Sequence, residues 1–248
     1  MRDVLPRRTH VYGVGPPKTG TMSLSRLFER YRTRHEAHIQ ETLSIIFCGD
    51  SREKTKKIHH RDRLGKLECE VGYFLVYICG DLACEFPNSK FICTVRPPRS
   101  WLRSIIDQCI NAPRKCIPEE YRLLRDYSFG PIPESYSSKE EPLARYGLHS
   151  LDGYLSYWSF HYKQVLDKIP SDRCLFVRTR NISKRIESIA EFVDIPKSSI
   201  CDEESHTHKT SKKHCVLSKI EENYLSRKIS HHCGNVYSLL QNKTLTSI

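Results

Sequence analysis

A short turn rich in glycine and proline near the N-terminus, VYGVGPPKTGTMSL at residues 11–24, has the composition of a phosphate-binding loop. An apolar strand is predicted at residues 10–14, and a helix is predicted at residues 20–31. Backbone N–H groups at such a strand-to-helix junction are available to bind an anion. Lys18 adds a positive charge two residues before Gly20. The segment therefore predicts a site for a phosphate or a similar anion.

The position of the lysine argues against a nucleotide site of the Walker type. The Walker pattern G-x-x-x-x-G-K-[ST] places lysine directly after the second glycine and a magnesium-binding hydroxyl after the lysine. Gly15 and Gly20 have the glycine spacing, but Thr21 takes the lysine position and Met22 takes the hydroxyl position. A methionine does not supply the oxygen ligand that Mg²⁺ requires. The dinucleotide pattern G-x-G-x-x-G also fails, because Lys18 stands at its third glycine. We therefore expect a donor that reacts without a bound metal ion.

A second motif, KFICTVRPPRSWLRSIID at residues 90–107, begins as a continuous apolar strand. This strand, at residues 91–95, is predicted to be buried on both faces. A helix is expected to begin near Pro98. Arg96 ends the strand, and Ser104 follows about two helical turns later. A forked guanidinium and a hydroxyl in these positions are suited to binding one phosphate together.

Together the two motifs resemble those of sulfotransferases that use 3′-phosphoadenosine 5′-phosphosulfate (PAPS). The string PKTGTMSL resembles the loop that binds the 5′-phosphosulfate, and the strand-end arginine with the later serine resembles the segment that binds the 3′-phosphate. The resemblance implies PAPS as co-substrate, no metal, and transfer to a hydroxyl or amine acceptor (EC 2.8.2). The donor-binding residues that it implies are Lys18, Thr19, Gly20, Thr21, Met22, Ser23, Arg96 and Ser104.

A late basic segment, HTHKTSKKH at residues 206–214, is a further candidate for the donor site. In sulfotransferases a late basic loop often closes over the 3′-phosphate. Lys209 or Lys212 would take that role here, and Lys209 is the residue that we assign to it.

Sulfuryl transfer also requires a group that accepts the proton of the acceptor. Lys18 and the N–H groups of the loop are expected to neutralise charge at the bridging oxygen, and a nearby His or Glu is expected to act as the general base. Two clusters offer such groups, His35-Glu36-x-His38 and Leu67-Glu68-Cys69-Glu70. We rank Glu36 first and Glu68 second, followed by His35 and Glu70. For each of them a structural ion pair, or a satisfied histidine, is the alternative.

Strand and helix patterns alternate along the chain, which predicts an α/β fold with a P-loop-like, three-layer α/β/α arrangement around a mostly parallel sheet. We expect residues 1–248 to form one sulfotransferase-like domain. Further strands are expected at residues 33–36, 67–71 and 174–177, and further helices at 39–47, 73–86, 150–168, 184–193 and 220–240. The basic run at residues 54–66 is expected to be a loop. An irregular stretch at residues 112–148 is expected to be a lid or substrate loop.

The net charge indicates which class of partner to expect, and the cysteine content indicates the redox state of the cellular compartment. The net charge of +11 favours an anionic ligand, but the basic residues are spread out and are not interleaved with aromatic residues, which argues against a nucleic-acid partner. Eleven cysteines without C-x-x-C spacing predict reduced thiols rather than disulfides or a zinc site. We expect no membrane span and a cytoplasmic protein, with the Golgi lumen as the location only if an N-terminal anchor is missing from this chain.

The acceptor is the part of the reaction that the motifs do not specify. A small molecule, a glycan or a lipid fits the resemblance equally well, and a homodimer is left open. Two alternative functions are a P-loop kinase that acts on a small metabolite and a catalytically inactive nucleotide-binding protein of the same fold. Met22 at the magnesium position argues against the kinase.

Overall fold

The structure is a computed structural model that describes residues 6–201 and 212–246. The chain divides into two compact units. The first comprises Met1–Val95, Gln164–His208 and Lys243–Ile248, and the second comprises Arg96–Lys163 and Lys209–Asn242. The phosphate-loop motif lies in the first unit. The helix of the second motif lies in the second unit, together with Arg96.

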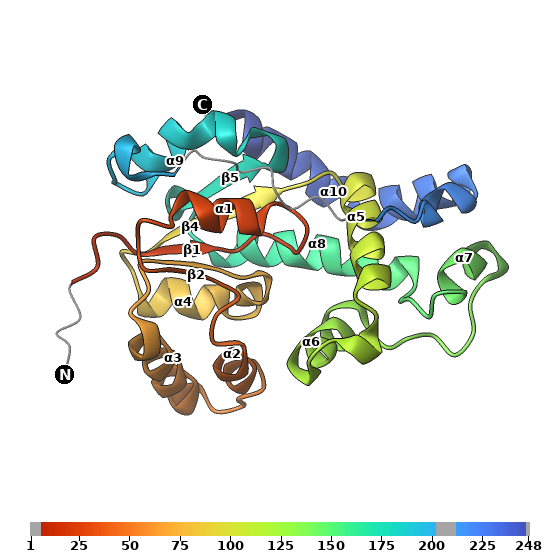
Figure 1. The fold of residues 1–248 in the computed structure, drawn as a ribbon, viewed down its shortest axis with the longest axis horizontal. Helices are drawn as coiled ribbons and strands as arrows, with labels where there is room; N and C mark the ends of the chain where they lie inside the picture. Colours follow the sequence, from red (N-terminus) through yellow and green to blue (C-terminus); the bar gives the residue numbers. More distant parts are fainter. Residues whose placement is uncertain (1–5, 202–211, 247–248) are drawn as a thin grey trace. The chain divides into compact units, whose positions relative to one another are not determined.

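A five-stranded parallel sheet forms the centre of the first unit, in the order β2-β3-β1-β4-β5 (Figure 1). Its strands are β1 (Val11–Gly13), β2 (Thr33–His35), β3 (Cys69–Val71), β4 (Lys90–Val95) and β5 (Cys174–Arg178). Gly13 pairs in register with Val71 and Ile92, and Val71 pairs with His35. The carboxyl ends of β1, β2 and β3 therefore lie side by side, which is where parallel α/β sheets bind their ligands.

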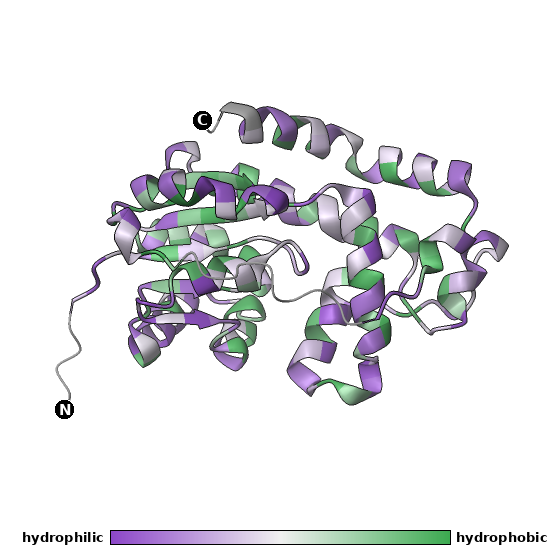
Figure 2. Ribbon diagram, turned by 45° about the horizontal axis from the view of Figure 1, so that its top comes forward, coloured by the Kyte–Doolittle hydropathy of each residue, from purple (hydrophilic) through white to green (hydrophobic). Residues whose placement is uncertain are grey.

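Helices cover both faces of this sheet, as a parallel sheet requires. On one face, α1 (Thr21–Leu27) and α9 (Ile186–Phe192) pack against buried apolar residues of the strands. On the other face, the ring of Tyr12 in β1 lies 6.4 Å from that of Phe86, which directly follows α4 (Cys79–Glu85). In Figure 2 the strands are coloured mainly as hydrophobic. The predicted α/β fold with a parallel sheet between helices is confirmed.

The remaining helices of the first unit differ in part from the expected ones. After α2 (Ile39–Ile46) the chain forms α3 (Ser51–Gly65), where we expected a loop at residues 54–66. Asp50 caps α3 by accepting a hydrogen bond from the backbone N–H of Glu53 at 2.7 Å. Only Ile58 and Arg61 of this helix are buried, so the apolar period that identifies a helix is missing from the sequence.

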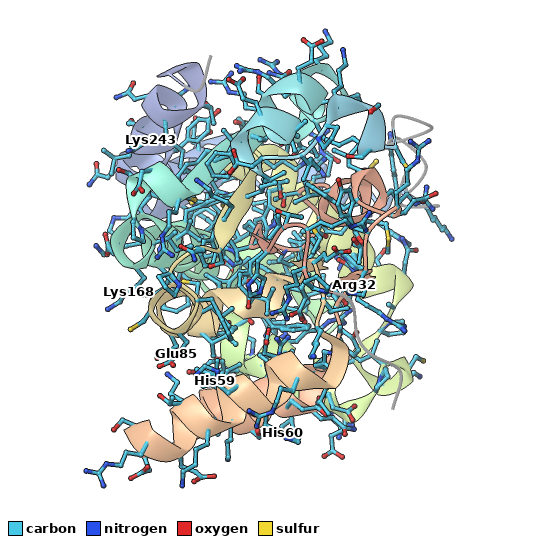
Figure 3. All side chains as sticks on the ribbon, turned by 90° about the vertical axis from the view of Figure 1, so that its left-hand side faces the viewer. Arg32, His59, His60, Glu85, Lys168 and Lys243 are labelled. Carbon is cyan, nitrogen blue, oxygen red and sulfur yellow. The ribbon has the colours of Figure 1, made fainter. Side chains whose placement is uncertain are left out.

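Helices α3 and α4 are joined by polar contacts. Figure 3 shows His59 of α3 beside Glu85 of α4, and the His59 Nε2 lies 2.9 Å from a Glu85 carboxylate oxygen. The predicted helix at residues 73–86 begins as a 3₁₀-helix (Tyr73–Ile78) before it continues as α4. The predicted helix at residues 20–31 is shorter, because α1 ends at Leu27.

Helices and short 3₁₀ turns make up the second unit. Its α-helices are α5 (Pro98–Asn111), α6 (Glu119–Phe129), α7 (Glu141–Ala144), most of α8 (Leu151–Lys168) and most of α10 (Glu222–Thr246). Four ring-bearing side chains along α8 are buried. They are Tyr154, Tyr157, Trp158 and His161.

The segment at residues 112–148 is largely folded, which corrects our expectation of an irregular stretch. Helix α6 begins after Pro118 with two glutamates in its first turn, which suits the positive end of the helix dipole. Leu124 and Phe129 are buried, and a guanidinium N–H of Arg125 donates to the carbonyl of Ala112 at 2.8 Å. The role of this segment as a lid or substrate loop stays a prediction.

Two of the earlier expectations concern the state of the cysteines and the presence of a membrane-spanning helix. All eleven cysteines are free thiols, and more than half of them are buried. Within residues 6–201 and 212–246, none of the helices has both the length and the apolar character needed to cross a bilayer.

Candidate functional site

The phosphate-loop motif connects the end of β1 to α1 through two residues in the left-handed region. Lys18 has a φ of 66° and Gly20 has a φ of 94°. Gly20 adopts this conformation without a steric cost, whereas Lys18 adopts it under strain, which is common at ligand sites. The loop also lies close to its surroundings, because a Cβ at Gly15 would come within 2.0 Å of Thr94 Oγ1. The backbone conformation around Lys18 is therefore tightly constrained.

The side chain of Thr19 holds this loop together from within. Its fully buried hydroxyl donates to the carbonyl of Pro16 at 2.6 Å and lies 2.6 Å from Thr94 Oγ1. The hydroxyl of Thr179, just after β5, lies 2.7 Å from the carbonyl oxygen of Thr19 and 3.1 Å from that of Val95. Thr19 was expected to bind the donor, but its hydroxyl instead fixes the loop. Any contact from Thr19 to a ligand would come from its backbone N–H.

The first turn of α1 carries the other loop residues of the motif. Met22 is 36% exposed, and Ser23 is half-buried. Thr21 is buried, and its hydroxyl lies 3.0 Å from His35 Nε2 at the end of β2. The first turn of α1 is therefore linked directly to the cluster that we considered for the general base.

Glu36, our first candidate for the general base, directly follows His35 at the end of β2. Its backbone N–H donates to the carbonyl of Val71 at 2.7 Å, and its φ of 52° turns the chain away from β2. A carboxylate oxygen of Glu36 is 4.0 Å from His35 Nε2. The structure thus brings Thr21, His35 and Glu36 together at the carboxyl edge of the sheet. Glu36 is partly exposed to solvent, so an acceptor can approach it.

Glu68 lies in a different environment, because its carboxylate is fully buried in an ion pair. It accepts hydrogen bonds from the Arg8 side chain at 2.8 and 2.9 Å and from the backbone N–H groups of Arg8 and Arg32 at 2.9 Å. Burial alone would raise the pKa of Glu68, but these hydrogen bonds outweigh it and lower the pKa to about 2. A carboxylate held in this way is a poor proton acceptor. We therefore replace the catalytic role expected for Glu68 with a structural one.

The carboxylate of Glu70 also forms an ion pair. Its carboxylate is buried against the guanidinium of Arg61 in α3, with one of the hydrogen bonds at 2.8 Å. The Arg61 Nε also donates to the hydroxyl of Thr42 at 2.8 Å. This buried pair joins α3 to the sheet, so Glu70, like Glu68, is held in an ion pair.

Glu68→Gln is expected to lower the free energy of unfolding by about 2–3 kcal/mol at pH 7, because it removes the charge from a buried pair. Since the pKa of Glu68 is lowered from 4.5 to about 2, its stabilisation is complete above pH 4.5 and is lost as the pH falls toward 2. The difference from the wild type should therefore shrink at pH 3. Urea unfolding at both pH values measures this. Glu187→Gln, at an exposed pair, is the control, and a Glu68→Gln variant as stable as this control would contradict the structural role.

Arg96 begins the second unit and is held at its backbone. Its N–H donates to the hydroxyl of Tyr162 at 3.2 Å, and its carbonyl accepts from the indole N–H of Trp158 at 3.2 Å. Burial, with Arg103 as a second cause, lowers the pKa of Arg96. An arginine in such an electropositive setting favours an anionic ligand. The Arg96 Nε donates to Ser100 at 3.4 Å, so Ser100 is a hydroxyl that the spacing argument missed.

Ser104 is half-buried on α5, one turn beyond Ser100. The end of the late basic segment lies beside the same helix. The backbone N–H of His214 donates to Asp107 at 2.9 Å, and the amide of Asn111 donates to the carbonyl of Lys212 at 2.9 Å. Lys209, which we assigned to the donor site, lies outside the described residues.

Among residues 6–201 and 212–246, no group of three or more His, Cys, Asp or Glu side chains is arranged to hold a metal ion.

A model of a known protein family matches most of this chain. The family model described as "Sulfotransferase domain" matches residues 10–200, well over half of the chain. The chain belongs to this sulfotransferase family. The match includes the phosphate loop, Glu36, Arg96 and Ser104. A search of curated protein sequences found no significant match.

Two solved structures to which the chain is similar are described as sulfotransferases. A sulfotransferase from Alicyclobacillus acidocaldarius is 16% identical, with 94% of this chain and 96% of that chain covered and a TM-score of 0.48. The sulfotransferase domain of the Synechococcus PCC 7002 olefin synthase is 10% identical, with 97% and 96% covered and a TM-score of 0.46. The family assignment rests on the family model, because these identities and scores are low.

Proposed function

We propose that this protein transfers a sulfuryl group from PAPS to a hydroxyl or amine acceptor, without a metal ion. The observation that carries the proposal is the position of the Lys18 loop, whose first helical turn contacts His35 and lies next to Glu36. A cation at a phosphate loop and a carboxylate beside it are the two groups that sulfuryl transfer requires. The family match supports the same reaction class.

In this reaction the sulfur of the donor forms a bond to the acceptor atom while its bond to the bridging phosphate oxygen breaks. The electron pair of the broken bond stays on that oxygen, and Lys18 with the loop N–H groups neutralises the resulting charge. Glu36 takes the proton from the acceptor, and Thr21 and His35 position Glu36. Met22 provides no metal ligand, so charge neutralisation falls to the protein's own cation.

The second phosphate of the donor is assigned to Arg96, Ser104 and a late lysine. This assignment rests on the family resemblance and on the electropositive setting of Arg96. Lys212 supports the expected role of the late basic segment, because its backbone is bonded to α5, the helix that carries Ser104.

The test is the binding of adenosine 3′,5′-bisphosphate, measured by calorimetry with and without Mg²⁺. We expect tight binding that does not depend on Mg²⁺ and that Arg96→Ala weakens by about tenfold, the effect of losing one charge-assisted phosphate contact. Arg99→Ala, which removes an exposed arginine paired with Glu222, is the control and should bind normally. Tighter binding of ATP with Mg²⁺ would overturn the proposal in favour of the kinase.

The acceptor is identified by turnover. Labelled PAPS is incubated with representative small alcohols, phenols, glycans and lipids, and transfer of the label is measured. Transfer to one class defines the acceptor. Binding of the bisphosphate without transfer to any class would favour the catalytically inactive protein of the same fold.

A further inference from the structure

Thr19, which directly follows Lys18 in the phosphate loop, is held by threonines from two neighbouring strands of the sheet. Its buried hydroxyl lies 2.6 Å from that of Thr94 in β4. Its carbonyl oxygen accepts a hydrogen bond at 2.7 Å from the hydroxyl of Thr179, the residue directly after β5. Strands β4 and β5 pair with each other, and all of these residues belong to the first unit. One strand therefore fixes the side chain of Thr19, and the other fixes its main chain.

The hydroxyl of Thr94 is a polar group in an otherwise apolar strand. Thr94 is fully buried, and valine would fill the same volume without burying a hydroxyl. Because the Thr19 hydroxyl donates to the carbonyl of Pro16, the proton of Thr94 is directed to the Thr19 oxygen. The loop lies directly on this hydroxyl, since a Cβ at Gly15 would collide with it. The geometry of the loop therefore explains why this strand position carries a hydroxyl.

The turn after β5 packs directly on Gly20, the residue that follows Thr19. A Cβ at Gly20 would lie 2.7 Å from Ile182 Cδ1 and 3.3 Å from Thr179 Cγ2. The peptide between Thr19 and Gly20 is trans, so its N–H points to the side opposite its carbonyl oxygen. The hydrogen bond from Thr179 to that oxygen therefore sets the direction of the Gly20 N–H.

We propose that Thr94 and Thr179 are positioning residues of the donor site. By fixing Thr19, they hold Lys18 in place and keep the N–H of Gly20 directed at the donor. The inference rests on the proposed function, in which Lys18 and the loop N–H groups neutralise charge on the bridging oxygen. Such groups are effective when their direction is fixed before the charge develops. The loss of a threonine hydroxyl should therefore affect turnover more than binding in the ground state.

Thr179→Val removes the hydroxyl and keeps the shape of the side chain. We expect the turnover of PAPS to fall about tenfold, because the loop donors lose their alignment. The affinity for adenosine 3′,5′-bisphosphate should fall only about threefold, the effect of one lost hydrogen bond. Thr179→Ser restores the donor and should return both values to within twofold of the wild type. Thr94→Val tests the second anchor and should change both values in the same direction as Thr179→Val. Initial rates with labelled PAPS and calorimetry measure these effects on the full chain.

Thr9→Val is the matched control for the loss of a threonine hydroxyl. Thr9 is also half-buried in the first unit, and its hydroxyl donates to the carbonyl of Val193 at 3.1 Å. Thermal unfolding followed by circular dichroism compares the stability of all variants. If Thr179→Val does not fold, Thr179→Ala replaces it with the same expected effects. Turnover in the Thr179 variant within twofold of Thr9→Val, or no recovery in Thr179→Ser, would overturn the positioning role.

The amide resonance of Gly20 gives a direct measurement that does not depend on turnover. In the ¹⁵N-labelled wild type, we expect saturation with adenosine 3′,5′-bisphosphate to move the Gly20 amide proton downfield, as for an N–H that donates to an anion. Thr179→Val should reduce this shift by at least about half, whereas Thr9→Val should leave it unchanged. Equal Gly20 shifts in these two variants would overturn the inference while leaving the proposed function intact.

A titration with inorganic pyrophosphate separates failure of the proposed function from failure of the inference. If the wild type does not bind the bisphosphate, the proposed donor is wrong, and the Gly20 resonance is then followed with pyrophosphate in the same variants. A shift of Gly20 that Thr179→Val reduces and Thr9→Val does not would support the positioning role for a different anion. No shift of Gly20 with either compound would overturn the inference as well.

Discussion

Lys18→Ala is expected to lower the turnover of PAPS by about 10²–10³-fold, the usual effect of removing one preorganised charge from a transition state. Lys18 is the cation of the loop, and its left-handed backbone and the crowding at Gly15 hold it in one position. The charge that develops on the bridging oxygen would then be neutralised by N–H groups alone. Initial rates with labelled PAPS and the acceptor found by the screen measure the effect.

Lys18→Ala should weaken binding of the donor in the ground state much less than it weakens stabilisation of the transition state. Adenosine 3′,5′-bisphosphate is expected to bind to Lys18→Ala about tenfold more weakly than to the wild type. Lys18→Arg keeps the charge and should retain part of the activity. Lys56→Ala, at an exposed residue of α3, is the control for the loss of a lysine elsewhere on the same unit. A turnover of Lys18→Ala within twofold of this control would remove Lys18 from the mechanism.

Glu36→Gln is expected to lower turnover by about 10²–10⁴-fold, because an amide does not accept the proton of the acceptor. The backbone hydrogen bond from Glu36 to Val71 does not involve the side chain, so the variant should keep the local fold. The affinity for adenosine 3′,5′-bisphosphate should therefore change less than twofold. The comparison of turnover with bisphosphate affinity separates a role in proton transfer from a role in donor binding.

Glu29→Gln is the matched control for Glu36→Gln, because Glu29 is an exposed glutamate just after α1. An unchanged turnover in Glu36→Gln would move the role of the base to His35, which contacts Thr21 directly. His35→Gln then becomes the decisive variant. Loss of turnover in His35→Gln but not in Glu36→Gln would give His35 the catalytic role.

The family and the fold could be predicted from the sequence because both rest on local patterns. The apolar run of β4 and the glycine spacing of the loop specify a parallel strand and a strand-to-helix turn within a few residues of each other. The five-stranded parallel sheet and the family match confirm these predictions. Helix α3 was missed because its stability comes from a cap at Asp50 and a buried ion pair rather than from an apolar stripe.

The choice among the acidic candidates could not be made from the sequence, because it depends on partners that lie far apart in the chain. Glu68 is neutralised by Arg8, sixty residues earlier, and no spacing rule identifies that pair. Thr94 and Thr179 were missed for the same reason. Each contacts the loop through a single hydroxyl, across 75 and 160 positions of the sequence.

The position of Thr179 has a consequence for how much the turn after β5 can change during evolution. This hydroxyl joins the carbonyl of Thr19 to that of Val95, so serine would preserve the link and valine would not. The side chains of Arg178 and Asn181 take no part in that link. They can therefore be exchanged without disturbing the loop, provided that position 179 keeps a hydroxyl.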